Sequence, residues 1–365
     1  MTKNNPENER IKRRYFAYLK EAKGYSESTI DGVAKALQRF ESHTRFRDFK
    51  AFHIEHATTF KKALGDERGV RSGRPLSKAT LASTLGALKA FFIWLAGQPG
   101  FKSRIAYADA EYFNPSEKDR MVARASREKR VPTLAQIHRV LETMPAGTPI
   151  ERRDRALIAF AILTGARDGA LASLQLKHVD LVEDCVHQDA RDVKTKFSKT
   201  FTTWFFPVGG QAREIVADWV AWLEREMLWG PDDPLFPATL VGNGEDNLFQ
   251  AQGLARRNWS NAGPIRTVFK HAFEQAGLPY YNPHTFRDTL VRLGEDLCPN
   301  AAAFKAWSQN LGHEKVLTTL TSYGSLSSRE QAEIIRSLGK KAEPDIGNVA
   351  DMAATLAELL KQAKR

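Results

Sequence analysis

The stretch Leu163-Thr-Gly-Ala-Arg167-Asp-Gly-Ala-Leu171 decides how the second half of the chain folds. Apolar residues predict a helix over residues 153–163, and Gly165 ends it because glycine adopts the left-handed conformation of a helix end at no steric cost. Arg167 then begins a new helical stretch, whose first backbone N–H groups favour an anion. An arginine in this position is ordinarily a surface residue, so its function has to be judged together with motifs further along the chain.

Two such motifs lie near the C-terminus. In His284-Thr-Phe-Arg287, the preceding Pro283 suits the first turn of a helix, and residues three apart share a helix face. An imidazole and a guanidinium on one face together suit a phosphate. The second motif is Leu311-Gly-His313, in which a glycine ends a helix, and Tyr323 follows in the next short helical segment. Each motif alone has an ordinary structural explanation.

Residues 179–208 form the only region with strong strand character. Valines and aromatic residues lie there among threonines and lysines, and a polar break at residues 197–200 predicts a hairpin or a small meander. Three lysines surround its turn: Lys194, Lys196 and Lys199. Residues 243–247 are expected to form an exposed loop. The remaining apolar spacing predicts helices over residues 134–143, 153–163, 212–227, 264–275, 284–297, 301–310 and 317–323, the first of which starts with the capping box Thr133-Leu-Ala-Gln136.

The first hundred residues predict a helical bundle. One apolar stripe runs from Ile30 to Phe40 at three- and four-residue steps, with a helix start at Ser28. A second stripe runs from Leu81 to Leu95, with Ser77 as its cap. Between them, residues 61–77 are rich in Gly, Arg and Lys and are expected to form a solvated loop. Its basic side chains can reach phosphates: Arg68, Arg71, Arg74 and, just beyond the loop, Lys78.

The charge of the chain indicates a polyanionic partner. The 365 residues include 54 Lys and Arg against 43 Asp and Glu, a net charge of +11. The isoelectric point is near 9.5, and such an excess most simply meets nucleic acid. Apolar periodicity stops between about residues 114 and 132, where basic side chains gather, so an interdomain linker that follows a phosphate backbone is expected there.

Several classes of protein are excluded by composition. Two cysteines, Cys185 and Cys298, rule out a disulfide framework, and no CxxC pair provides a thiolate zinc site. No cluster of His, Asp and Glu has metal-ligand spacing. Apolar runs are too short for a membrane span, and the first residues lack an apolar signal core. We therefore expect a soluble protein of the cytoplasm, associated with the nucleoid and without membrane contact.

The ordered set of motifs resembles the tyrosine recombinase (phage integrase) family. Residues 163–171 are similar to the family's first arginine box, residues 284–289 to its second box, and residues 311–323 to its third box with the nucleophile. Two positions depart from the usual pattern: Ala170 stands where an acidic residue is common, and Asp288 stands where histidine is common. The resemblance covers residues 133–325 and, more weakly, the helical region 14–101.

The resemblance implies a fold and its domains. The fold is mainly α with a small antiparallel β-sheet (α+β), an N-terminal helical bundle followed by a tyrosine-recombinase-like catalytic domain. The expected parts are a helical core-DNA-binding domain (1–112), a basic linker (113–132), the catalytic domain (133–340) and a C-terminal amphipathic helix or tail (341–365). The tail carries an apolar stripe from Ile346 to Leu359, which docks either on a neighbouring protomer or on its own domain.

The resemblance also implies how a phosphodiester would be cut. Arg167 and Arg287 clamp the non-bridging oxygens of the scissile phosphate, since guanidinium forks match phosphate geometry and stay charged. His313 adds a third hydrogen bond. Tyr323 attacks phosphorus and forms a 3′-phosphotyrosine, and His284 takes its proton or holds the phosphate. The covalent bond conserves energy, so neither ATP nor a cofactor nor a metal is needed.

A lysine of the hairpin would protonate the departing 5′-oxygen. The turn at residues 195–200 resembles the family's turn, which selects Lys196. Counting back from Pro207 instead selects Lys199, and Lys194 lies two residues from Lys196 on the same predicted strand face. Lys196 is preferred because residues before a turn are less affected by a longer returning strand.

The partners implied are double-stranded DNA, a homotetramer on two paired sites, and accessory directionality factors. Two other functions use similar residues. A type IB topoisomerase shares the arginine, lysine, histidine and tyrosine chemistry, and a non-catalytic DNA-binding protein can retain a recombinase fold. The intact set of motifs favours a recombinase.

Overall fold

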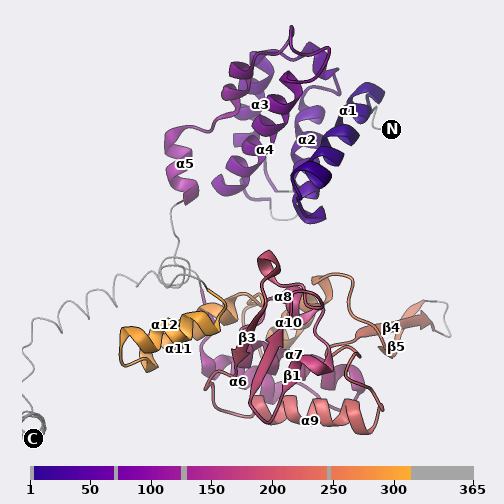
Figure 1. The fold of residues 1–365 in the computed structure, drawn as a ribbon, viewed down its shortest axis with the longest axis vertical. Helices are drawn as coiled ribbons and strands as arrows, with labels where there is room; N and C mark the ends of the chain where they lie inside the picture. The colour runs from indigo at the N-terminus through magenta and orange to yellow at the C-terminus, as the bar shows by residue number, and fades with distance from the viewer. Residues whose placement is uncertain (1–3, 70–72, 125–129, 245–247, 314–365) are drawn as a thin grey trace, which may run out of the picture. The chain divides into compact units, whose positions relative to one another are not determined.

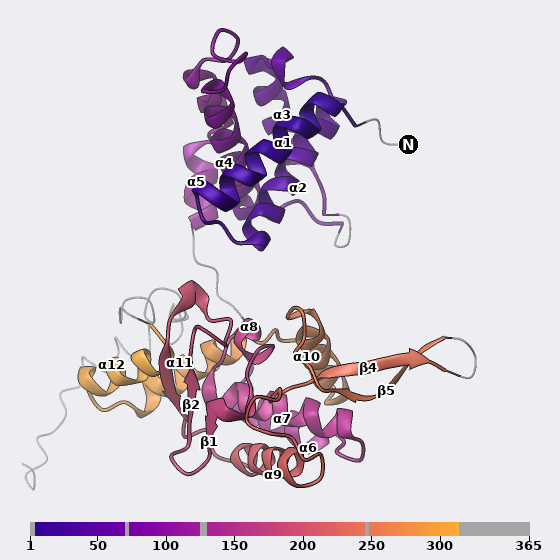
Figure 2. The ribbon, with the colours of Figure 1, turned by 45° about the vertical axis from the view of Figure 1, so that its right-hand side comes forward.

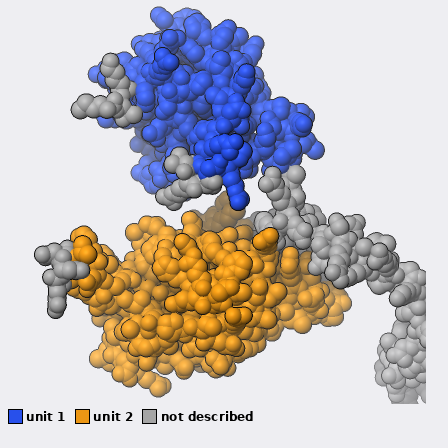
Figure 3. All heavy atoms as spheres, turned by 180° about the vertical axis from the view of Figure 1, so that it is seen from behind, with its two compact units in different colours: residues 1–127 blue, residues 128–365 orange. Residues whose placement is uncertain are grey.

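The computed structural model describes residues 4–69, 73–124, 130–244 and 248–313. The chain divides into two compact units, residues 1–127 (unit 1) and residues 128–365 (unit 2), which are coloured separately in Figure 3. Helices dominate both units, and unit 2 also holds two small antiparallel sheets (Figure 1). The predicted fold class, mainly α with a small antiparallel sheet, is confirmed.

Unit 1 is a helical bundle with an aromatic core. Helix α4 runs through its centre, and eight of its side chains are buried, which is why the helix is long and apolar enough to resemble a membrane span. Phe92 of α4 packs on Phe52 and Phe113, with ring centroids 4.1 and 5.2 Å apart. The helices of the bundle are α1 (Pro6–Ala17), α2 (Glu27–His43), α3 (Ile54–Asp66), α4 (Lys78–Ala96) and α5 (Glu117–Arg124), with the 3₁₀ helix η3 (Tyr107–Phe113) before α5.

Helix boundaries in unit 1 differ from the expectation in three places. Helix α2 begins at Glu27 with Ser26 as N-cap, so the predicted start at Ser28 is wrong by two residues. Helix α3 reaches Asp66, which shortens the predicted loop, whereas Ser77 caps α4 as expected by accepting a hydrogen bond from Thr80 N (3.1 Å). Residues 117–124, which lie within the predicted linker, form α5, which packs on α4.

Unit 2 is built around helix α7, whose residues 156–163 are at most 4% exposed. Helices α9 and α11 pack on it, and α6 lies beside it (Figures 1 and 2). The capping box at the start of α6 is present: Thr133 Oγ1 accepts from Gln136 N (3.2 Å), and Gln136 Oε1 accepts from Thr133 N (3.0 Å). The helices are α6 (Leu134–Thr143), α7 (Pro149–Thr164), α8 (Asp168–Leu171), α9 (Ala212–Arg225), α10 (Gly263–Gln275), α11 (Thr285–Leu297) and α12 (Ala301–Asn310). Within the described residues, they match the predicted helices to within four residues at either end.

The first sheet is the predicted meander. Strands β1 (Val179–Asp180), β2 (Cys185–Gln188) and β3 (Phe201–Trp204) pair in antiparallel order β1-β2-β3. Val186 of β2 is fully buried, and Thr203 opposite it is 1% exposed, so one face of this sheet joins the core.

The second sheet was not expected. Strands β4 (Ala238–Asn243) and β5 (Phe249–Ala255) form a hairpin that extends from the body of unit 2 in both Figure 1 and Figure 2. The prediction of only one strand region is therefore wrong. Of the loop predicted at residues 243–247, Asn243 belongs to β4, and residues 245–247 lie outside the described residues.

Candidate active site

Arg287 is the centre of the site. It lies in the first turn of α11, is 2% exposed, and donates to two main-chain oxygens, Gly165 O and Leu311 O. Its guanidinium also lies 2.9 Å from Nε2 of His313. One side chain therefore joins the three motifs that the sequence analysis selected separately.

Gly165 makes this junction possible. It ends α7 in the left-handed conformation, with a φ of 57°. A Cβ atom placed on it would lie only 3.0 Å from both Leu290 Cδ1 and Leu311 Cδ2, closer than carbon atoms normally pack. The turn is closed from inside by Thr164, whose hydroxyl accepts from Ala166 N at 3.1 Å. The predicted glycine turn is confirmed, and α11 and α12 approach it closely.

His313 lies after a second glycine turn. Gly312 has a φ of 72°, and a Cβ there would meet the ring of Phe201 at 2.9 Å. His313 is 6% exposed. Because a guanidinium only donates, Nε2 of His313 accepts from Arg287, which puts the proton of the neutral ring on Nδ1.

Positive charge converges on this imidazole. The pKa of His313 is lowered from 6.5 to about 3, first by burial and then by the charges of Arg287, Arg167, His284 and Lys196. His313 is therefore neutral at pH 7. Four predicted residues thus act electrostatically on a fifth, His313, and the sixth, Tyr323, lies outside the described residues.

Arg167 is the N-cap of α8 and is partly buried. Helix α8 is a single turn of four residues, so the expected contribution of its N–H groups to anion binding is small. Asp168, the residue after Arg167, pairs with Arg266 at 2.7 Å. His284 is the N-cap of α11 and is exposed, and its backbone N–H donates to Asn282 Oδ1 (3.0 Å).

The three lysines lie on a loop and not on strands, so the expectation of a shared strand face is wrong. Residues 189–200 connect β2 to β3, and the 3₁₀ turn η5 (Lys196–Ser198) contains Phe197 at a φ of 62°. Lys196 Nζ lies 4.9 Å from the centroid of the Phe197 ring, and Lys199 Nζ lies 6.0 Å from it. Lys194 Nζ instead reaches Ser260 O at 3.4 Å. Among these three lysines, Lys196 is the one whose charge is among the main causes that lower the pKa of His313.

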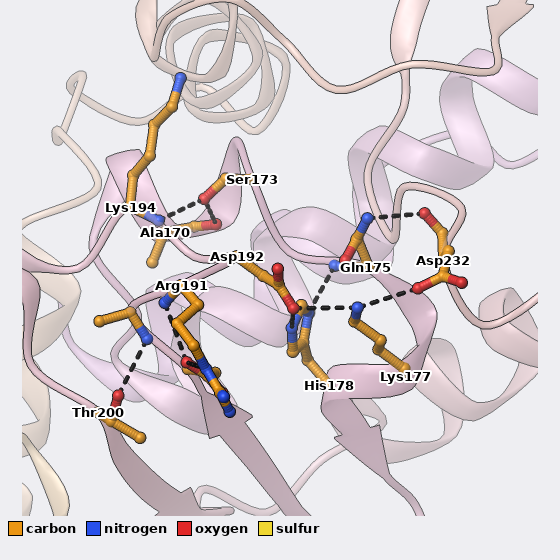
Figure 4. A network of polar contacts seen from close by, with 12 residues as sticks. Ala170, Ser173, Gln175, Lys177, His178, Arg191, Asp192, Lys194, Thr200 and Asp232 are labelled. Atoms are coloured by element: carbon orange, nitrogen blue, oxygen red, sulfur yellow. Dashed lines mark hydrogen bonds and ion pairs between the residues drawn. The ribbon is translucent and has the colours of Figure 1, made fainter.

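A polar network holds this loop (Figure 4). Ser173 Oγ accepts from Lys194 N at 2.8 Å. Lys177 pairs with Asp192 at 2.9 Å and with Asp232 at 2.9 Å. Thr200 Oγ1 accepts from Ala190 N at 3.1 Å, which ties the two ends of the loop together.

Apart from Lys194 and Thr200, these residues belong to none of the predicted motifs. The only signal for Ser173 was a small hydroxyl residue within the apolar run from Leu171 to Leu176. Such residues are common in cores, and nothing in the sequence connects Ser173 to a loop about twenty positions further on.

Comparisons with known proteins give matches to both units of the chain. The sequence profile described as the phage integrase family matches residues 130–330, and that of the phage integrase N-terminal SAM-like domain matches residues 13–98. Tyrosine recombinase XerC of Bacillus subtilis (strain 168) is 23% identical over 313 residues, covering 84% of this chain and 88% of that protein. Tyrosine recombinase XerD of Neisseria meningitidis (serogroup A / serotype 4A strain DSM 15465 / Z2491) is 26% identical over 253 residues, covering 66% of this chain and 71% of that protein.

Solved structures share the fold. A lambda integrase (75-356) dimer bound to a COC′ core site matches with a TM-score of 0.60 and 13% identity, covering 88% of this chain and 96% of that one. The Tn1549 transposon integrase in complex with a circular intermediate DNA matches with a TM-score of 0.56 and 14% identity, covering 90% of this chain and 99% of that one.

Proposed function

The chain belongs to the phage integrase family, and on that premise we propose that it is a site-specific DNA recombinase that cuts and rejoins duplex DNA through a covalent tyrosine intermediate. The observation that carries the proposal is the contact of Arg287 with Gly165 O, Leu311 O and His313, which joins the three motifs. The charges of Arg167, His284 and Lys196 also act on His313. Four cationic or protonatable groups around one buried imidazole suit a ligand that is itself an anion. A phosphodiester of DNA is the anion that a chain of net charge +11 meets most readily.

The two arginines would bind the scissile phosphate. Arg287 is already fixed by Gly165 O and Leu311 O before any ligand arrives, so little reorganisation is needed at the moment of reaction. Arg167 lies on the adjoining turn, and its fork can bind the second non-bridging oxygen. In the complex, a change of tautomer that moves the proton of the neutral ring from Nδ1 to Nε2 would let His313 donate to the same phosphate in place of its contact with Arg287.

Tyr323 would attack phosphorus and displace the 5′-oxygen, which leaves a 3′-phosphotyrosine and a free 5′-hydroxyl. Lys196 would give the proton that the departing oxygen needs, and His284, exposed at the start of α11, would take the phenolic proton or hold the phosphate. The new ester keeps the energy of the broken bond, so rejoining to another strand needs neither ATP nor a metal.

The assembly follows from the same chemistry. Exchange of two duplexes needs four cuts, which four protomers on two paired sites would supply, with accessory factors setting the direction. Such a protein would act on DNA in the cytoplasm, at the nucleoid. The helical domain (1–112), the linker (113–132), the catalytic domain (133–340) and the tail (341–365) would share the work of enclosing DNA, cutting it and joining protomers.

The test is covalent trapping. The full chain is expressed in cells, lysis in strong denaturant preserves only covalent adducts, and the attached DNA is sequenced. Wild type is expected to recover a defined DNA site, whereas Tyr323→Phe should bind DNA normally and recover nothing. An adduct with the Phe variant would place the nucleophile elsewhere. No adduct with wild type would favour a non-catalytic DNA-binding protein, and relaxation of plasmids lacking the site would favour a topoisomerase.

A further inference from the structure

We propose that Ser173 is a positioning residue for Lys196. Its hydroxyl holds the loop of residues 189–200 against α8, the helix whose N-cap is Arg167. This inference rests on the proposed function, in which Lys196 is the general acid. Lys196 is exposed, and its ammonium ends a flexible four-carbon stem. Its placement at a leaving oxygen therefore depends on how firmly the backbone of the loop is held.

Ser173 supplies the firm contact. Its side chain is buried, with 4% of the residue exposed. The hydroxyl accepts from Lys194 N at 2.8 Å and points its own proton at the carbonyl of Ala170, at 3.2 Å (Figure 4). The carbonyl of Gly169 lies at 3.1 Å from the same hydroxyl. Both roles of one hydroxyl are thus used, one toward the loop and one toward α8.

The backbone amide of Lys194, which Ser173 holds, is close in the chain to Lys196, the proposed general acid. Only Thr195 separates Lys194 from Lys196, and two residues span at most about 7 Å of chain. Val193, directly before the anchor, is 2% exposed and belongs to the core. The loop also touches α8, because a Cβ on Gly169 would lie 3.4 Å from Lys194 O. The segment that precedes the η5 turn is therefore held on both sides.

The second tie to the loop is weaker. Lys177 and Asp192 form an ion pair at 2.9 Å, but their side chains are 36% and 40% exposed, and exposed pairs contribute little. Of these two side-chain contacts, the buried one of Ser173 is therefore the stronger. Ser173 Oγ contacts both α8, which follows Arg167, and the loop that carries Lys196. It would therefore help to keep a constant distance between the phosphate-binding arginine and the proton donor.

The experiment compares two substrates, both built on the DNA site recovered by covalent trapping. One is normal DNA, and the other has sulfur in place of the bridging 5′-oxygen, which leaves without a proton. Ser173→Ala is expected to slow single-turnover cleavage of normal DNA about 10- to 100-fold, the range that a small misplacement of a catalytic group produces. Cleavage of the sulfur substrate and affinity for DNA should stay within about 3-fold of wild type. Ser173→Thr keeps the hydroxyl and should restore most of the rate.

Two control variants make the outcome decisive. Thr239→Val removes a hydroxyl that accepts from Arg153 at 3.0 Å and lies far along the sequence from the loop. It should change the cleavage rates of the two substrates by the same factor, or change neither rate. Lys196→Ala should be slow on normal DNA and recover on sulfur. If Lys196→Ala recovers but Ser173→Ala is equally slow on both substrates, or is as fast as wild type, the positioning role is wrong while the proposed function stands. If Lys196→Ala does not recover, the general acid is another residue and the inference falls with it.

Discussion

Gly165→Ala tests whether the glycine turn under Arg287 is required by packing as well as by backbone conformation. The backbone φ of 57° costs an alanine about 1–2 kcal/mol. The new methyl would also lie 3.0 Å from both Leu290 Cδ1 and Leu311 Cδ2, and overpacking of a buried site costs about 1–3 kcal/mol more. The expected loss in unfolding free energy of unit 2 is therefore about 2–5 kcal/mol.

Gly209 provides the matched control. Its φ is 63°, nearly the same, but a Cβ there meets no atom within 4 Å. Gly209→Ala should cost only the backbone part, about 1–2 kcal/mol. The difference between the two variants isolates the packing against Leu290 and Leu311.

Urea unfolding followed by tryptophan fluorescence is the suitable assay. Six of the seven tryptophans lie in unit 2, so the signal reports mainly on the unit that carries the change. The midpoint for unit 2 is compared at equal slope, because a chain of two units is not expected to unfold in one step. Equal losses for Gly165→Ala and Gly209→Ala would refute the packing argument and leave only backbone conformation as the reason for the glycine.

Two further predictions concern proton binding and assembly. The folded protein holds His313 neutral down to about pH 3, whereas the unfolded chain protonates it near pH 6.5, so the unfolding free energy of unit 2 falls as the pH drops through that window, by about 2 kcal/mol at pH 5. His313→Gln should lack this part of the pH dependence, and parallel stability curves for the two proteins would contradict the shift. Deleting residues 345–365 should leave binding to a single DNA site nearly intact and weaken assembly on two paired sites, measured by gel mobility. Unchanged assembly would mean that the tail packs on its own domain.

The sequence predicted elements where one physical signal dominated. Helix α6 was located to the residue because the capping box at Thr133 and the apolar spacing agree. The end of α7 was predicted correctly because Gly165 adopts the left-handed conformation that ends a helix, whereas the central place of Arg287 between the three motifs was not predicted. The β4–β5 hairpin was missed because large apolar side chains such as Leu240 and Phe249, 45% and 82% exposed, stay in water, which removes the alternation that marks a half-buried strand.

The loop of Lys196 shows a different limit. Alternating valine, lysine and threonine around Val193 are typical of a strand, yet the left-handed conformations of Phe197 and Ser198 and the buried contact with Ser173 give a loop. The contact with Ser173 is long-range, and the spacing of residue types within the loop does not predict it. The same holds for Asp168, whose partner Arg266 lies about a hundred positions along the chain.

The anchorage of Arg287 has a consequence for how such sites drift during evolution. Its two acceptors are main-chain oxygens, and a carbonyl persists whatever side chain its residue carries. Substitution at Leu311 therefore removes no acceptor from Arg287. What cannot change freely is the backbone path at Gly165 and Gly312. A search for remote kin of this chain should weight those two turns above the side chains beside the arginine.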